Sequence, residues 1–326
     1  MRSLGVLVAS CLLASSLPAS ATPRPLQYVV ISFDGAHDIP QWERSRKLAR
    51  ESGARFTYFL SCVYLLSPEK RHLYQGPKAK PGRSNVGFAT SRDDVARRLR
   101  QIWAARMEGH EIASHGCGHF DGKDWNGAEW RAEFDAFGDI LRDAWTINGI
   151  PFEPASWREF AATEVTGFRA PYLSTSEGLD RALADQGFRY DASGVSRGPA
   201  EPDEKGGVVR FSLPLIPEGP QARPVIAMDY NLFVRHSGGL ERPGEAAAFE
   251  ERAYRAFSAA FGQQYEGQRI PLQIGFHFTL MNDAAYWRAL ERFAHETCAR
   301  AEVRCVTYGD LAEIAFPSRT GAVEID

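Results

Sequence analysis

Short apolar segments rich in β-branched residues alternate with amphipathic helical segments along most of this chain. The first, QYVVISF at 27–33, is followed by a helical stretch that ends at Gly53, and RFTYFLS at 55–61 begins the pattern again. Continuous apolar runs are typical of parallel strands that are buried on both faces, and Gly commonly ends a helix. The alternation therefore predicts an α/β fold built on a parallel sheet or barrel.

The same alternation continues toward the end of the chain. Further helices are predicted at 91–109, 126–145, 175–186, 244–262 and 283–300. Further strands are predicted at 110–114, 166–173, 187–193, 224–233, 271–278 and 303–308. Two irregular stretches, 67–90 and 194–224, interrupt the pattern, and loops of that length in a compact domain are usually functional or disordered.

The N-terminal segment has the features of a secretory signal peptide. One Arg precedes an apolar run from Leu4 to Leu17, and the small residues 19–21 follow. Because the run is short and is broken by Ser and Pro, it predicts export with cleavage after Ala21 rather than an integral membrane span. We therefore expect a secreted or periplasmic protein whose single domain covers 22–326.

Polar side chains stand where several predicted strands end. Asp34 ends the first strand, Arg169 and Tyr172 follow a later one, and His277 lies in IGFHF. In parallel α/β folds the chemistry collects at the carboxyl ends of the strands. These side chains are therefore predicted to face one rim of the sheet or barrel.

The segment GHEIASHGCGH at 109–119 holds three of the eight histidines. A zinc-protease motif needs two His four residues apart on a helix, but His110 and His115 are five apart and EIAS between them predicts a strand. His115 and His119 form the better pair, because the glycines between them allow a tight turn that points both imidazoles inward. We interpret His110 as a structural residue.

Together these segments resemble the motifs of the polysaccharide deacetylase family, the carbohydrate esterases with NodB homology. SFDG at 32–35 resembles T-F-D-D-G, GHEIASHGCGH resembles G-H-E-I-x-N-H-[TS]-x-x-H, FRAPY at 168–172 resembles F-R-P-P-Y, and IGFHF resembles a late L-x-H motif. Their order and spacing agree over roughly residues 28–315. The resemblance implies a distorted (β/α)7-type barrel with long loops over its C-terminal rim.

The resemblance also implies roles for the rim residues. Asp34 would be the catalytic base, and Arg169 would hold it ionised, since an adjacent guanidinium lowers a carboxylate pKa. The backbone N–H of Tyr172 would help to bind the oxyanion, and His277 would be the general acid. Asp229, in preference to Asp191, would support His277, because its predicted strand lies nearer in sequence.

The metal site departs from the family pattern. The resemblance implies one divalent metal ion, most often zinc, on His115 and His119, with a second aspartate directly after Asp34 as the third ligand. Gly35 stands at that position. Three interpretations stay open: Asp38 is the third ligand, which we prefer; Asp34 moves onto the metal; or the metal is weak or absent. Asp38 also suits the N-cap of the helix that follows.

Aromatic side chains near the rim are candidate platforms for a sugar ring. The candidates are Tyr64, Trp125 and Tyr172. Trp125 is expected to be exposed, because it lies in the Asp- and Gly-rich segment FDGKDWNG.

The sequence therefore predicts a metal-dependent hydrolase that removes N-acetyl groups from a glycan containing N-acetylglucosamine, such as peptidoglycan, a chitin-like glycan or poly-N-acetylglucosamine. The metal would polarise the acetyl carbonyl while Asp34 deprotonates water and His277 protonates the departing amine. The alternatives are a non-catalytic glycan-binding relative and an amide hydrolase acting on a non-sugar. Nucleic acid is not an expected partner, because the net charge is −3 and no basic run is present.

Four cysteines remain after the predicted cleavage, an even number that permits two disulfides in an exported protein. Cys62 ends the second strand and Cys117 follows the third. Since consecutive strands of a parallel barrel are usually neighbours, these two are predicted to form a disulfide. Cys298 and Cys305, which join the last helix to the last strand, are the second candidate pair.

Overall fold

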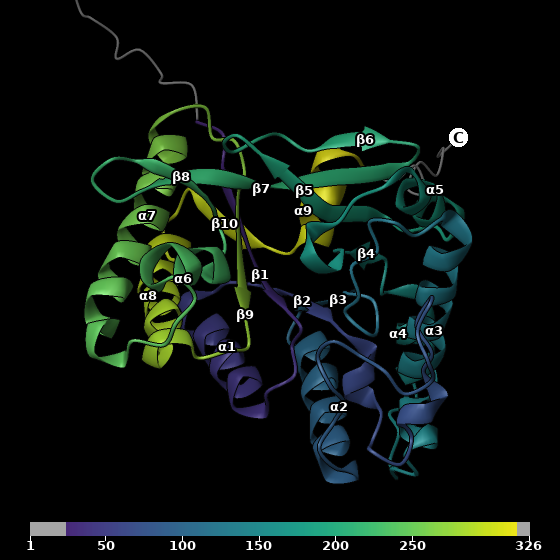
Figure 1. Ribbon diagram of the computed structural model, residues 1–326. Helices are drawn as coiled ribbons and strands as arrows, with labels where there is room; N and C mark the ends of the chain where they lie inside the picture. Colours follow the sequence, from purple (N-terminus) through teal and green to yellow (C-terminus); the bar gives the residue numbers. More distant parts are fainter. Residues whose placement is uncertain (1–23, 318–326) are drawn as a thin grey trace, which may run out of the picture.

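The computed structural model describes residues 24–317, and it shows strands with helices packed along their flanks and below them in the view of Figure 1. The predicted signal peptide lies outside the described residues. The strands are β1 (Gln27–Asp34), β2 (Thr57–Leu60), β3 (Glu111–Ser114), β4 (Gly167–Phe168), β5 (Tyr190–Ser196), β6 (Asp203–Lys205), β7 (Val208–Glu218), β8 (Arg223–Ile226), β9 (Leu272–His277) and β10 (Val303–Val306). The helices are α1 (Ile39–Ser52), α2 (Arg92–Met107), α3 (Gly127–Ile147), α4 (Trp157–Thr163), α5 (Glu177–Asp185), α6 (Asp229–Ser237), α7 (Ala246–Glu266), α8 (Met281–Cys298) and α9 (Tyr308–Ala315).

The strands form one curved, mostly parallel sheet. β1, β2, β3, β4, β5 and β7 lie in that order and pair in parallel, and β9 pairs in parallel with the other side of β1. The chain after β8 links β7 to β9, because Ala227 N–H donates to Pro214 O at 2.9 Å and Gly275 N–H donates to Ala227 O at 2.9 Å. The predicted α/β barrel with a distorted ring of parallel strands is therefore confirmed.

Two predicted segments differ from the structure. The stretch 194–224 was expected to be irregular, but it contains an antiparallel hairpin of β6 and β7, which turns at Gly206 and Gly207, both with positive φ. The prolines within β7 weaken its strand pattern in the sequence. The single strand predicted at 224–233 is instead β8 followed by α6, so that Asp229 begins a helix.

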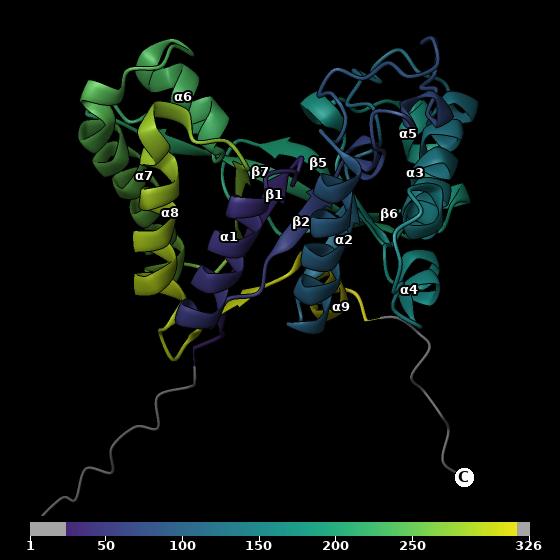
Figure 2. The same cartoon turned by 90° about the horizontal axis from the view of Figure 1, so that it is seen from below.

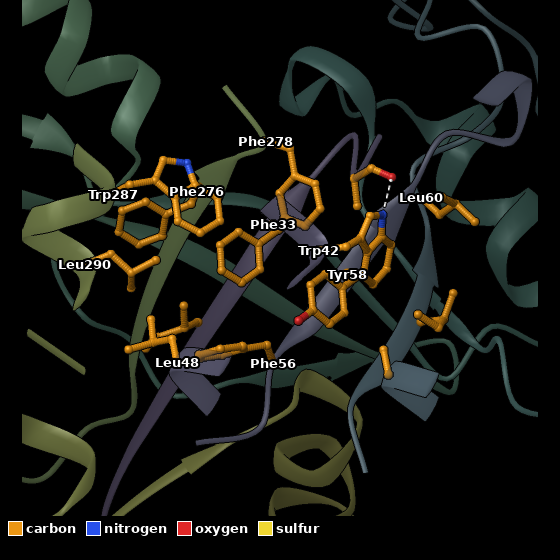
Figure 3. Close-up of a cluster of buried hydrophobic side chains, with 14 of the residues drawn as sticks. Phe33, Trp42, Leu48, Phe56, Tyr58, Leu60, Phe276, Phe278, Trp287 and Leu290 are labelled. Atoms are coloured by element: carbon orange, nitrogen blue, oxygen red, sulfur yellow. Dashed lines mark hydrogen bonds between the residues drawn. The ribbon is translucent and has the colours of Figure 1, made fainter. Parts of the chain in front are cut away.

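Helices surround the outside of the barrel. Figure 2 shows α7, α8, α1, α2 and α3 in succession around the strands, and each neighbouring pair in this series is in contact. Between α1, α8 and the strands β1, β2 and β9 lies a cluster of buried aromatic rings (Figure 3). The ring centroid of Phe33 lies 5.4 Å from that of Tyr58 and 5.2 Å from that of Trp287. Full burial of such a side chain contributes about 1.5–3 kcal/mol, so this packing fixes β1 relative to β2 and α8.

The register of the parallel strands brings the predicted rim residues together. Asp34, the last residue of β1, lies opposite His277, the last residue of β9. On the other side of β1, Ser114 of β3 pairs with Phe168 of β4, so His115 and Arg169 are the next residues on adjacent strands. Sequence positions far apart thus meet at one end of the barrel, which we call the C-terminal end.

Both predicted disulfides are confirmed. Cys62 and Cys117 are bonded with Cα atoms 4.4 Å apart, and Cys298 and Cys305 are bonded with Cα atoms 5.5 Å apart. Among residues 24–317, no helix is long and apolar enough to cross a membrane.

Candidate active site

A buried ion pair forms the centre of the C-terminal end. Arg169 is fully buried, Asp34 is 4% exposed, and the guanidinium Nη1 donates to Asp34 Oδ1 at 2.7 Å. Burial by itself would raise the pKa of Asp34, but the positive charge of Arg169 and its hydrogen bond outweigh this effect and lower that pKa. Asp34 is therefore ionised at neutral pH.

A second pair lies beside the first. His277 Nδ1 lies 2.7 Å from Asp229 Oδ1, and the His277 backbone N–H donates to Asp229 Oδ2 at 2.8 Å. Burial opposes protonation of His277, but the carboxylate of Asp229 and its hydrogen bond, together with Asp34, raise the pKa of the imidazole. Asp191 does not contact His277; its carboxylate binds Arg210 at 2.8 Å and Ser193.

His115 and His119 also face each other at this end, with ring centroids 5.0 Å apart. His115 Nδ1 lies 2.8 Å from the carbonyl oxygen of Arg169, so Nδ1–H donates and Nε2 keeps a free lone pair. Burial lowers the pKa of His115 to about 3 and also lowers that of His119, which keeps both imidazoles neutral. His119 Nδ1 is buried without a hydrogen-bond partner.

The turn that carries His119 is held by a buried carboxylate. Glu133 of α3, 2% exposed, accepts hydrogen bonds from Cys117 N–H at 2.7 Å and Gly118 N–H at 3.1 Å. Tyr74 donates to the same carboxylate at 2.8 Å, and its hydroxyl accepts from Gly118 N–H at 2.9 Å. A Cβ at Gly118 would meet that hydroxyl at 2.4 Å, so only glycine fits here. The disulfide at Cys117 fixes the same turn.

Asp38 does not complete a three-ligand metal site with the two histidines. It occupies the N-cap position of α1, where its side chain makes no capping hydrogen bond. Arg98 donates to the carbonyl oxygen of His37 at 2.6 and 2.8 Å, which fixes the backbone directly before Asp38. Residues 24–317 contain no group of three His, Cys, Asp or Glu side chains placed to hold a metal ion. The structure therefore gives no support for Asp38 as the third ligand, and that assignment stays a prediction.

The position that would carry the third ligand has no side chain. Gly35 follows Asp34 with a φ of +60°, and a Cβ there would have no atom within 4 Å. His115 and His119 together supply two imidazole donors of the kind that zinc accepts. The residues present thus fit two ligand positions and do not fit a metal ion held by three protein side chains.

The predicted aromatic platforms differ in exposure. Tyr172 is 59% exposed and its ring lies 4.9 Å from that of His119, so it remains a candidate. Tyr64 is only 6% exposed and stacks on His37, whereas Trp125 is 7% exposed and packs against Trp130. Both are core residues, because neighbouring aromatic rings cover their faces.

Tyr230 was missed by the sequence reasoning. It is 53% exposed, and its ring centroid lies 6.1 Å from that of His277. The available signal was its position directly after Asp229. A strand was expected at this point, and successive residues of a strand point to opposite faces. The start of helix α6 instead places both Asp229 and Tyr230 beside His277.

A large hollow lies at the opposite end of the barrel. Its volume is 590 Å³, and its lining includes His110, Glu111, Thr307 and Asp310. His110 is buried there, and its Nδ1 accepts a hydrogen bond from Phe56 N–H at 3.0 Å. Burial lowers the pKa of His110 to about 4, in agreement with its interpretation as a structural residue.

Solved structures with the same fold include polysaccharide deacetylases and an allantoinase. A putative polysaccharide deacetylase from Mycobacterium smegmatis is 18% identical, with a TM-score of 0.56 over 92% of this chain and 94% of its own. A probable polysaccharide deacetylase from Pseudomonas aeruginosa PAO1 is 15% identical, with a TM-score of 0.54 over 90% and 92%. Puue allantoinase is 16% identical, with a TM-score of 0.54 over 93% and 96%.

Comparison of the sequence itself adds no relative, because no protein-family model and no curated protein matches it. The likeness is therefore one of fold. This chain is a (β/α) barrel with the polysaccharide deacetylase fold. Its C-terminal end carries a buried pair, Asp34 with Arg169, and a partly buried pair, Asp229 with His277.

Proposed function

We propose that this protein is a hydrolase of the polysaccharide deacetylase family that removes N-acetyl groups from a glycan containing N-acetylglucosamine. The observation that carries the proposal is the pair of titratable groups in register at the ends of β1 and β9. Arg169 lowers the pKa of Asp34 against the effect of burial, and Asp229 raises the pKa of His277 against the same effect. Opposite shifts in neighbouring groups provide one base and one acid at the same pH.

The two groups suit the two proton transfers of amide hydrolysis. Asp34 accepts a proton from water as the water oxygen bonds to the acetyl carbon. His277 donates a proton to the amide nitrogen as the C–N bond breaks, which yields acetate and a free amine. The neutral imidazoles of His115 and His119 accept hydrogen bonds from the water, and the backbone N–H of Tyr172 binds the carbonyl oxygen that becomes negatively charged.

The site of action in this proposal lies outside the cytoplasm. The signal peptide predicted at 1–21 supports export, and the two disulfides agree with an oxidising compartment. Peptidoglycan, chitin-like glycans and poly-N-acetylglucosamine are the proposed substrates. The exposed ring of Tyr172 beside His119 and that of Tyr230 beside His277 are the proposed contacts with the sugar.

A non-catalytic glycan-binding protein is the second candidate. Gly35 and the lack of a three-ligand group among residues 24–317 favour it, since a weakened metal site is one way in which a hydrolase loses activity. The first candidate requires turnover, whereas the second requires binding without turnover.

Acetate release separates the candidates. The exported protein is incubated with N-acetylglucosamine oligomers, chitin fragments and peptidoglycan fragments, with and without a chelator, and allantoin is included as a non-sugar amide. Acetate from a glycan supports the first candidate. Binding of the same glycans without release supports the second, and turnover of allantoin alone would contradict both.

A substitution at Gly35 tests the metal separately. Gly35→Asp supplies the carboxylate that the family pattern has at this position, in open space. We expect zinc affinity to rise by about tenfold or more, because a third protein ligand joins two imidazoles. Gly53→Asp is the matched control, since Gly53 also has positive φ and open space but lies at the end of α1. Zinc affinity is measured by calorimetry. Equal affinity in wild type and Gly35→Asp would show that a carboxylate at this position takes no part in metal binding.

A further inference from the structure

Arg169 donates hydrogen bonds to several groups besides Asp34, its ion-pair partner in the site. Its Nε donates to Ala192 O at 3.0 Å, and Nη1 donates to Ser32 Oγ at 2.9 Å as well as to Asp34 at 2.7 Å. Its Nη2 donates to the hydroxyl of Tyr308 at 2.8 Å. Four separate acceptors therefore fix the plane of a fully buried guanidinium, and Asp34 is only one of them.

Tyr308 reaches Arg169 from the far end of the sequence. It is the first residue of α9, it is fully buried, and its ring is packed against those of Phe59, Tyr190 and Phe211 at centroid distances of 5.7, 5.6 and 5.0 Å. Burial raises the pKa of Tyr308 to about 12, so the hydroxyl stays neutral and accepts the arginine N–H. The ring cannot rotate away without opening this packing.

The backbone of the same turn is anchored at the N-terminal end of the barrel. Tyr308 N–H donates to Thr57 Oγ1 at 3.0 Å, and Thr57 Oγ1 donates to Glu111 Oε2 at 2.7 Å. Gly309 N–H donates to the same Glu111 oxygen at 3.1 Å. Glu111 at the start of β3 therefore holds the start of α9. Hydrogen bonds at both ends of Tyr308, its backbone N–H and its hydroxyl, thus connect Glu111 through Thr57 to Arg169 and Asp34.

We propose that Tyr308 is a positioning residue for Asp34: its hydroxyl fixes the guanidinium of Arg169, and Glu111 fixes Tyr308 from the opposite end of the barrel. The proposal rests on the proposed role of Asp34 as the base. Tyr308 touches no reacting group in this scheme and acts through Arg169.

The physical reason lies in the geometry of the guanidinium. Its N–H groups point in fixed directions, so an arginine that is correctly placed for Asp34 must be correctly placed for its other acceptors as well. Removal of the Tyr308 hydroxyl leaves a buried N–H without a partner, and the guanidinium then tilts to recover one. The carboxylate that it binds turns with it. Small displacements of this kind reduce the rate much more than they reduce substrate binding.

The first experiment needs no substrate. Protein with ¹⁵N-labelled arginine is prepared as wild type and as Tyr308→Phe, which keeps the ring. The guanidinium signal of Arg169 is assigned through its displacement in Asp34→Asn. In wild type we expect separate, slowly exchanging N–H signals for the fixed group, and in Tyr308→Phe we expect them to merge or exchange at least about tenfold faster.

Tyr58→Phe is the matched control. Tyr58 is also a fully buried tyrosine next to Phe33, and its hydroxyl donates to Ser45 Oγ at 3.0 Å, without contact to Arg169. The control loses one buried hydrogen bond of the same kind. We expect it to leave the Arg169 signals unchanged. Unchanged signals in Tyr308→Phe as well would overturn the proposal.

The second experiment measures turnover with any glycan that releases acetate. Tyr308→Phe should lower kcat by about tenfold and leave KM within about twofold, because orientation of the base is changed and not the sugar contacts. Glu111→Gln, which keeps one acceptor for Thr57 or Gly309, should lower kcat by a smaller factor. Equal kcat in Tyr308→Phe and Tyr58→Phe would contradict the positioning role. If no glycan is turned over, the proposed function fails, and the arginine signals still decide whether Tyr308 fixes Arg169.

Discussion

The two ends of the barrel each hold a buried carboxylate, and the two behave in opposite ways. At the C-terminal end Asp34 binds the guanidinium of Arg169 at 2.7 Å, and its pKa is lowered. At the N-terminal end Glu111 accepts hydrogen bonds from Thr57 and Gly309 but binds no cation. Burial raises the pKa of Glu111 to about 7. Both carboxylates are buried, so the neighbouring charge, and not burial, decides which of them has a lowered pKa and can accept a proton at neutral pH.

The comparison also shows that a hollow of considerable volume need not lie at the end of the barrel that carries the candidate acid and base. The 590 Å³ hollow lies at the Glu111 end, where the charged side chains in its lining are bound in pairs such as Arg106 with Glu164 and Arg189 with Glu313. The groups with matched acid and base character lie at the other end.

The largest expected effect comes from exchanging the carboxylates for amides. Asp34→Asn should lower acetate release by about 10³-fold, because the amide cannot accept the proton of water. Glu111→Gln should lower it by no more than a small factor. Initial rates on the best glycan of the panel provide the measurement. Comparable losses in the two variants would break the distinction between the two ends.

Each end also carries one disulfide. Removal of the two disulfides should lower the free energy of unfolding by different amounts. Cys62–Cys117 closes a separation of 55 residues beside the candidate site, whereas Cys298–Cys305 closes a separation of 7. Loop entropy gives about 4 kcal/mol for the first and about 2 kcal/mol for the second. Urea unfolding of the two double Cys→Ser variants measures both. Equal losses would show that loop length does not set the contribution of these bonds.

A smaller effect is expected from the support of the acid. Asp229→Asn should lower kcat by about 10²-fold, since the amide no longer stabilises protonated His277. The alkaline limit of the pH profile should move to lower pH, because the pKa of His277 is raised mainly by the charge of Asp229 against burial. Asp191→Asn is the control, as Asp191 binds Arg210 instead. An unchanged alkaline limit in Asp229→Asn would remove His277 from the role of acid.

A slope in stability with pH is expected at the Glu111 end, with no more than a small effect on activity. In the folded protein the pKa of Glu111 is about 7, above its ordinary value of 4.5, so between these values the folded state binds the extra proton. The free energy of unfolding should therefore fall as pH rises through this window, by up to about 1.4 kcal/mol per pH unit. Glu111→Gln should remove this part of the slope. An identical slope in the variant would show that Glu111 titrates normally.

The sequence pattern was most informative where structure and role depend on neighbours along the chain. Asp34, His115, Arg169 and His277 each end or follow a strand, and parallel strands place such residues at one rim whatever the details of packing. The pairing of Cys62 with Cys117 followed from the same reasoning. By contrast, the Asp- and Gly-rich surroundings of Trp125 suggested an exposed ring, and packing against Trp130 buries it.

By itself, the sequence determined the alternation of strands and helices, the end of the barrel that gathers the polar residues, and the two disulfide pairs, because each depends on short-range periodicity and strand order. Only the tertiary structure decided that Asp229 rather than Asp191 supports His277, that Arg98 binds the carbonyl oxygen of His37, and that Tyr308 reaches Arg169. These contacts join residues 48, 61 and 139 positions apart (277 − 229, 98 − 37 and 308 − 169). No local pattern encodes them, since they depend on which side chains the closed barrel brings within hydrogen-bond distance or within range of a charge.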